Sequence, residues 1–91
     1  MLYITDASYI SEYRIRLSFN DGRKGITDLK RTVFEDQRPI IRKLQSLACF
    51  RSFHLDMDTV VWENGVDFAP EFLRDNVVEW LTSSPHLPLT T

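Results

Sequence analysis

The side chains best suited to hold a metal ion lie in the second half of the chain. They are one histidine and four carboxylates: His54, Asp56, Asp58, Asp67 and Glu71. Imidazole and carboxylate groups suit several divalent ions. The stretch from Asp56 to Val60 nevertheless lacks the glycine and the distal glutamate of a calcium loop, and no second histidine lies at helical or strand spacing from His54. A metal-dependent enzyme is therefore only the third function considered, and we expect no metal and no cofactor.

No set of residues in the chain predicts covalent catalysis. A nucleophile needs a base and an orienting group, and such sites are recognised by three-dimensional geometry. The single cysteine, Cys49, lies between Ala48 and Phe50, which is typical of a buried structural thiol. The chain contains three glycines and no glycine-rich phosphate loop. We therefore expect a protein that is not an enzyme.

Basic residues near the first predicted hairpin form the strongest candidate for a nucleic-acid patch. They are Arg14, Arg16, Arg23 and Lys24. Four phosphate contacts would give a weak, salt-sensitive affinity, because strong binders neutralise about six to ten phosphates. The alternative interpretation is that these charges keep an open sheet face or edge soluble. A small nucleic-acid-associated regulator is thus the second function considered, and nucleic acid is not the expected partner.

The length and composition of the chain indicate one small globular domain. The 91 residues are 43% apolar and 26% charged, a balance that supports a core. The formal net charge is −2, yet residues 1–53 carry ten basic groups against six acidic ones, whereas residues 54–91 carry one against seven. This asymmetry favours a polar partner or head-to-tail contacts, and a solvated surface without further meaning is the alternative.

Cysteine content and hydropathy predict where the protein resides. One cysteine cannot form an intramolecular disulfide, which favours a reducing, cytoplasmic setting. The N-terminus has no basic stretch followed by an apolar run, so we expect no signal peptide. No apolar segment approaches the ~18 residues needed to cross a bilayer, so we expect no membrane span.

Three strands are predicted in the first third of the chain. Apolar and polar residues alternate over residues 13–19, which places one face in the core and the other in water. Asp21-Gly22 tolerates the positive φ angles of a tight hairpin turn, so a return strand is expected over residues 24–29. Residues 2–7 have strand composition and are close enough in sequence to pair with the first strand. These strands predict an antiparallel meander.

The rest of the chain combines helical and strand patterns after a polar stretch that ends at Arg38. Pro39 suits a first helical turn, so a helix is predicted over residues 39–47. Residues 50–55 and 59–62 are predicted to form a second hairpin. Pro70 begins a last helix, whose apolar stripe is expected to lie on the sheet and consists of Leu73, Val77, Trp80 and Leu81.

These elements predict an α+β fold. Its expected parts are a three-stranded antiparallel meander, a helix, two short strands and a C-terminal helix packed on the sheet. Residues 1–81 are expected to form a single domain. Residues 82–91 contain two prolines and no apolar periodicity, and they are predicted to be a flexible tail.

The order of landmarks along the chain resembles a bacterial family. Residues 62–73 read W-x-N-G-x-D-x-A-P-E-x-L, from Trp62 to Leu73, and Phe19-Asn20-Asp21-Gly22 and Thr27-Asp28-Leu29 precede them. This pattern is similar to that of the domain-of-unknown-function family number 2442 (DUF 2442), and the likeness covers roughly residues 3–73. The resemblance implies three strands, a helix, two strands and a helix, in agreement with the elements predicted above.

What the resemblance implies about function concerns partners. Members are typically short bacterial proteins, and many are encoded beside another small protein in arrangements similar to toxin–antitoxin pairs. Some members carry a helix-turn-helix domain, which these 91 residues lack, and Arg74 stands where many members have tyrosine. The resemblance therefore implies a protein partner and puts direct DNA binding in doubt.

Two interpretations of residues 62–73 remain open. In the structural one, Trp62 ends a strand, Asn64-Gly65 forms a turn, and Asp67 with Pro70 starts a helix. In the functional one, four side chains form an interaction surface: Trp62, Asn64, Asp67 and Glu71. We predict a non-catalytic protein-interaction module that presents this surface or a sheet edge to another small protein, encoded alongside it, or to a second copy as a homodimer.

Overall fold

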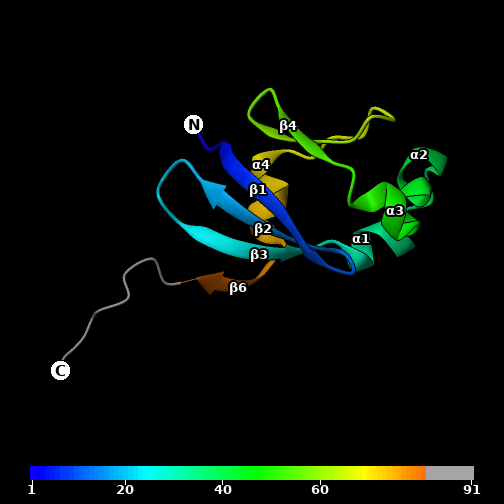
Figure 1. Cartoon of the computed structure of the whole chain (residues 1–91), viewed down its shortest axis with the longest axis horizontal. Coiled ribbons are helices and arrows are strands. Elements are labelled where there is room, and N and C mark those ends of the chain that lie inside the picture. The colour runs from blue at the N-terminus through cyan, green and yellow to red at the C-terminus, as the bar shows by residue number, and fades with distance from the viewer. Residues whose placement is uncertain (82–91) are drawn as a thin grey trace.

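The computed structural model describes residues 1–81, and the predicted tail over residues 82–91 lies outside the described residues (Figure 1). The fold is α+β, as predicted. The strands are β1 (Ile4–Ser11), β2 (Arg14–Phe19), β3 (Lys24–Asp28), β4 (His54–Asp56), β5 (Thr59–Val61) and β6 (Val77–Leu81). The helices are α1 (Lys30–Glu35), α2 (Pro39–Arg42), the 3-10 turn η1 (Lys43–Gln45), α3 (Leu47–Phe50) and α4 (Pro70–Asp75).

The main sheet has four antiparallel strands in the order β1-β2-β3-β6. Its first three strands form the predicted meander. Along β2 the side chains of Ile15 and Leu17 are buried, whereas those of Arg14 and Arg16 are exposed. This alternation gives the sheet a core face and an open face. The turn between β2 and β3 contains Gly22 at a φ of 91°, the positive value that the Asp-Gly pair predicted.

A lobe of short helices, α1 to α3, gathers at one end of the sheet (Figure 1). The prediction of one helix over residues 39–47 was wrong, because the chain leaves helical conformation at Ser46, with φ of −71° and ψ of 122°. The Ser46 Oγ then accepts a hydrogen bond from the Cys49 backbone N–H and starts α3, which is how a serine favours a new helix start. Phe50 consequently ends a helix and does not begin a strand.

The polar stretch before Pro39 also contains a helix that the sequence analysis missed. α1 has no acidic residue in its first turn and no side-chain cap, so the usual markers of a helix start are absent. Val33 is its buried residue, and its neighbour Phe34 packs edge-to-face on Tyr13 at 5.4 Å between ring centroids. Tertiary contacts on one side therefore stabilise a helix too short to persist alone.

The second correction concerns the C-terminal helix. α4 ends at Asp75, and residues 77–81 form β6, which pairs with β3. Trp80 is opposite Gly25 in this pairing, and Leu81 is opposite Lys24. Two adjacent valines and a tryptophan have high strand propensity, and β3 offers a row of free backbone groups that a helix would leave unpaired. The predicted apolar stripe is thus divided between a helix and a strand.

The core lies between the inner face of the sheet and the layer formed by the helices and the β4-β5 hairpin. Trp62 and Phe50 are the largest fully buried side chains. Their rings lie 5.7 Å apart, and Phe68 packs edge-to-face on Trp62 at the same separation. No helix within the described residues is long and apolar enough to span a bilayer.

Candidate functional site

The four predicted basic residues do not form one patch. Arg14, Arg16 and Lys24 lie on the open face of the sheet, where the register pairs Arg16 with Ile26 and Arg14 with Asp28. Asp28 also accepts a hydrogen bond from Arg14 Nε at 3.0 Å. This ion pair is exposed and therefore contributes little to stability, but it reduces the positive charge on the face.

Arg23 is directed to the other side of the sheet. Its guanidinium carbon lies 3.7 Å from the centroid of the Trp80 ring, a cation–π contact. Trp80 itself covers Gly25, where an added Cβ would meet Trp80 Cε3 at 3.0 Å. Because Gly25 and Leu17 are cross-strand partners and both are buried, this contact lies on the core face. Arg23 is thus separated from the other three basic residues.

The helical lobe concentrates positive charge that the sequence analysis did not single out. Residues 30–51 contain six basic residues against two acidic ones. The basic residues are all exposed: Lys30, Arg31, Arg38, Arg42, Lys43 and Arg51. Arg31 pairs with Glu35 and Arg38 with Asp36. A count of charge over residues 30–51 alone would have found this lobe.

The pair of Asp36 and Arg38 bridges α1 and α2. Arg38 Nη2 lies 2.7 Å from Asp36 Oδ2, and the Arg38 backbone N–H donates to Asp36 Oδ1 at 2.9 Å. These hydrogen bonds favour the carboxylate and lower the pKa of Asp36 to about 2. The two acidic residues of the lobe are therefore both occupied by arginine side chains, which leaves the remaining basic residues facing solvent.

Trp62 and Asn64, from the predicted interaction surface, serve the fold. Trp62 is 1% exposed, and its Nε1 donates to the Phe50 carbonyl at 2.6 Å, so its side chain belongs to the core. Asn64 Nδ2 donates to the Ile40 carbonyl at 3.0 Å, and its Oδ1 accepts from the Val66 N–H at 3.3 Å. Gly65 has a φ of 95° in the same turn. This turn anchors the loop after β5 onto α2.

Asp67 and Glu71 are the exposed members of the predicted interaction surface. Asp67 forms an isolated antiparallel bridge with Val61, and Glu71 lies in the first turn of α4, where negative charge is favourable. Neither residue has an ion pair within residues 1–81. The surface that these side chains could offer therefore consists of two carboxylates and excludes the Trp62 ring.

In the part of the chain that the structure describes, the candidate metal ligands and Cys49 do not come together in one site. Within residues 1–81, no three His, Cys, Asp or Glu side chains are grouped so that they could hold a metal ion. His54 and Asp56 are exposed on β4, and Asp58 follows Met57 in a turn where both have positive φ values. Cys49 is half-buried beside the core, and it has no disulfide partner.

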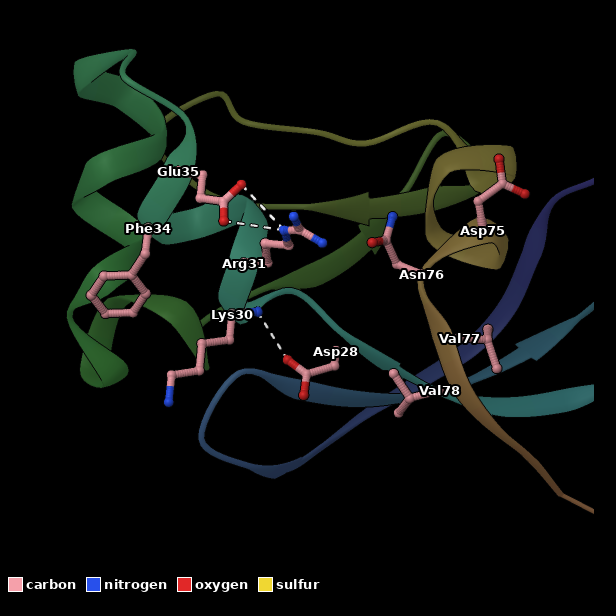
Figure 2. A pocket seen from close by; sticks show the side chains of 9 residues that line it. All are labelled: Asp28, Lys30, Arg31, Phe34, Glu35, Asp75, Asn76, Val77 and Val78. Carbon is pink, nitrogen blue, oxygen red and sulfur yellow. Dashed lines mark hydrogen bonds and ion pairs between the residues drawn. The ribbon is translucent and has the colours of Figure 1, made fainter.

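An open groove of about 570 Å³ lies between α1 and the junction of α4 with β6 (Figure 2). Phe34 on one side and Val77 and Val78 on the other supply its apolar surface. The Arg31–Glu35 ion pair and Asp28 lie at its rim, and Asp28 Oδ1 accepts from the Lys30 N–H at 2.9 Å. This groove could not be predicted from local sequence patterns, because its walls come from two separate segments, residues 28–35 and residues 75–78.

The outer edge of β6 adjoins this groove. β6 ends the strand order of the sheet, so no strand within residues 1–81 pairs with its outer side. The register shifts between Ile26 and Thr27, which leaves Val78 as a bulge residue without a cross-strand partner. Val78 is 61% exposed and Trp80 is 40% exposed. The structure therefore places an apolar edge strand and an apolar groove side by side.

Comparison with known proteins assigns the family. The family model described as "Protein of unknown function (DUF2442)" matches residues 4–79, which is most of the chain. The chain belongs to the DUF2442 family. This agrees with the resemblance inferred from the sequence, and the matched residues include every strand of the main sheet apart from the end of β6. No curated protein and no solved structure matches the chain.

Proposed function

We propose that this DUF2442 chain is a non-catalytic protein-interaction module that binds an extended segment of a partner protein along the outer edge of β6. The observation that carries the proposal is the apolar edge strand at the end of the sheet. A small protein encoded alongside this chain, as in toxin–antitoxin-like pairs, is the first partner to examine.

Unpaired backbone groups provide the affinity in this mode of binding. Each residue of a strand carries an N–H donor and a C=O acceptor, and on an edge strand alternate pairs point away from the sheet. An added strand satisfies these groups by main-chain hydrogen bonds, while its alternate side chains provide specificity. The five residues of β6 give a peptide room for such pairing.

The side chains of β6 do little to prevent this pairing. Edge strands are usually protected by charges, proline or a covering segment. β6 contains one charged residue, Glu79, and no proline, and its other residues are valine, tryptophan and leucine. An exposed strand of this composition is typical of an interaction site.

The test is affinity capture with two matched variants. Val78→Lys adds a charge to the β6 edge, and Ile10→Lys adds the same charge to an exposed bulge residue on β1, at the opposite edge. Nuclease-treated lysate of the organism that encodes the chain is the source of partners. We expect a stoichiometric protein that is retained by the wild type and by Ile10→Lys and is lost with Val78→Lys.

Two other outcomes would change the proposal. A partner that is unaffected by Val78→Lys but lost with Asp67→Ala and Glu71→Ala would move the interface to the carboxylates before and within α4. If each retained protein bound all of these variants equally, the interaction proposal would lose its support.

A second candidate function, a small nucleic-acid-associated regulator, is favoured by the basic helical lobe. A hollow of about 330 Å³ on this lobe is lined in part by Arg42 and Lys43. The test is retardation of RNA and DNA at low salt by the wild type and by a variant with Arg42→Ala and Lys43→Ala. A regulator would show affinity that falls with salt and a smaller salt slope in the variant. Absence of retardation would remove this candidate.

A further inference from the structure

We infer that the groove between α1 and β6 is a specificity pocket for one apolar side chain of the partner strand, and that the same strand carries a basic residue beside Glu79. This inference rests on the proposed function, because it assigns side-chain chemistry to a strand that β6 would bind. The partner class is an extended, positively charged segment with a branched aliphatic or aromatic anchor.

The continuity of the groove with the strand edge is the first argument. Val77 and Val78 belong both to β6 and to the groove, so a strand paired with β6 would pass directly over its opening. Phe34 lines the groove from α1 and is 51% exposed, and in the view of Figure 2 the side chains of Lys30 and Asp28 lie between its ring and Val78. An apolar side chain that enters the groove from the β6 edge would remove apolar surface of Val77 and Val78 from water.

The bulge at Val78 is the second argument. A bulge bends its strand and redirects a side chain away from the regular alternation. Here the irregularity falls at the residues that line the groove, between the pairs Thr27–Val77 and Ile26–Glu79. The exposed Val78 side chain is therefore accessible to a partner strand from the edge.

Charge defines the second feature of the partner. Glu79 has no ion pair within residues 1–81. Asp75 Oδ1 and Arg74 Nε form a long ion pair of 3.7 Å, and both side chains are exposed. Asp28, by contrast, already accepts hydrogen bonds from Arg14 and from the Lys30 backbone. The carboxylates on the α4 and β6 side can therefore attract a basic group, and like charge there would be repelled.

The position of that basic group follows from strand geometry. Val78 and Glu79 are adjacent, and strand residues rise about 3.3 Å each. A partner residue that reaches Glu79 must therefore lie within two positions of the residue in the groove. A second copy of this chain fits less well, because an antiparallel pair of β6 strands centred on its middle residue would oppose Glu79 with Glu79.

The experiment is selection of peptides from a random nine-residue display library on the immobilised full chain. We expect enriched peptides to contain one Leu, Ile or Phe with Lys or Arg one or two positions away. Replacement of that apolar residue by Ala in a synthetic peptide should weaken binding roughly tenfold or more, the range seen for apolar pockets. Selection on Glu79→Lys should enrich Asp or Glu instead, whereas Glu63→Lys, a distant surface control, should leave the preference unchanged.

Amide chemical-shift mapping of the peptide complexes distinguishes failure of the pocket inference from failure of the proposed function. Peptides that map to β6, lose affinity with Val78→Lys, and yet show no apolar or charge preference would overturn the pocket and retain the proposed function. Peptides that map elsewhere, or the recovery of none, would overturn both. Reversal of the charge preference by Glu79→Lys together with an essential apolar anchor would establish the pocket. Sedimentation of the free chain as a dimer through β6 would replace the peptide by a second copy and overturn the inference.

Discussion

The two edges of the main sheet, β1 and β6, differ in how the molecule protects them. The β1 edge is met at its start by the β4-β5 hairpin, where the Ile4 N–H donates to the Asp58 carbonyl at 2.9 Å. Its sequence, ITDASYIS, contains four polar or charged residues. β6 reads VVEWL, and no strand within residues 1–81 pairs with its outer side. Protection of one edge and exposure of the other is the pattern expected of a sheet that binds at one side.

Among single substitutions, Gly25→Val should change the difference between the β1 and β6 edges most. A Cβ at this position would lie 2.9 Å from Val77 Cγ1 and 3.0 Å from Trp80 Cε3, so β6 would have to move away from β3. We expect a loss of about 2 kcal/mol in the free energy of unfolding, as is typical of overpacking. Chemical denaturation measures the loss, and hydrogen exchange should accelerate in β6 before β1. Ser18→Val on the open face is the control, and equal losses in both variants would contradict this account.

Trp80→Ala should have the next largest effect. The ring packs against Phe19 at 5.8 Å between centroids and lies under the guanidinium of Arg23. Because the ring is partly exposed, we expect the free energy of unfolding to fall by about 1.5 kcal/mol, through loss of apolar burial and of the cation–π contact. Thermal unfolding provides the measurement. Tyr3→Ala, beside β1, should change stability by less than about 0.5 kcal/mol, and a larger effect there would mean that the β1 edge depends on its aromatic side chain.

Two buried threonines allow a matched test of the two sides of the sheet. Thr27 Oγ1 donates to the Leu73 carbonyl at 3.0 Å and ties α4 to β3, next to β6. Thr59 lies in β5, which contacts β1, and its Oγ1 donates to the Phe68 carbonyl. Each change to valine should cost about 1 kcal/mol, since a buried carbonyl loses the hydrogen bond from the threonine hydroxyl. Hydrogen exchange should rise near β6 in Thr27→Val and near β1 in Thr59→Val, and a uniform rise in both would show that the sides are not independent.

Low pH should have the smallest effect on stability, and it should affect the β1 and β6 edges equally. The pKa of Asp36 is lowered to about 2 by its hydrogen bonds with Arg38, so the folded state binds this proton less readily than the unfolded state. The contribution is present above the ordinary pKa of 3.8 and is lost as the pH falls from there through about 2. Denaturation at pH 5 and pH 2 should show a slightly smaller acid loss in Asp36→Asn. The ratio of exchange rates in β6 and β1 should be the same in both proteins.

Local pattern was sufficient for the meander and for the second hairpin. The alternation along β2 and the Asp-Gly turn each express a preference that only neighbouring residues are needed to satisfy. The same holds for the turn at Asn64-Gly65, where the backbone requires a positive φ. These features were therefore predicted in the correct place, with strand ends displaced by a few residues.

The apolar pattern was insufficient where the same residues fit both a helix and a strand. Val77, Trp80 and Leu81 have spacings that fit a helix, yet they pair with β3 as a strand. The free edge of β3 and the absence of a side chain at Gly25 decided this, because together they give Trp80 a surface on which to pack. Spacing within one segment carries no information about a partner fifty residues away.

The candidate site shows the same limit. Four candidate residues lie on the surface, as their sequence patterns indicated. They are the carboxylates Asp67 and Glu71 and, on the open face of the sheet, Arg14 and Arg16. Trp62 could not be assigned between core and surface from the sequence, since both environments accept tryptophan next to a turn. In the structure Trp62 is buried in the core, and its Nε1 donates a hydrogen bond to the Phe50 carbonyl at the end of α3.

The sequence by itself determined the α+β class, the meander, the turns and the family, because these depend on periodicity, local backbone preference and motif order. Tertiary structure alone decided which strand forms the exposed edge and where the groove lies. Both features arise because α4 and β6, which are distant in sequence from α1 and β3, pack beside them. Their packing, rather than any one segment's preference, therefore creates the surface proposed to bind a partner.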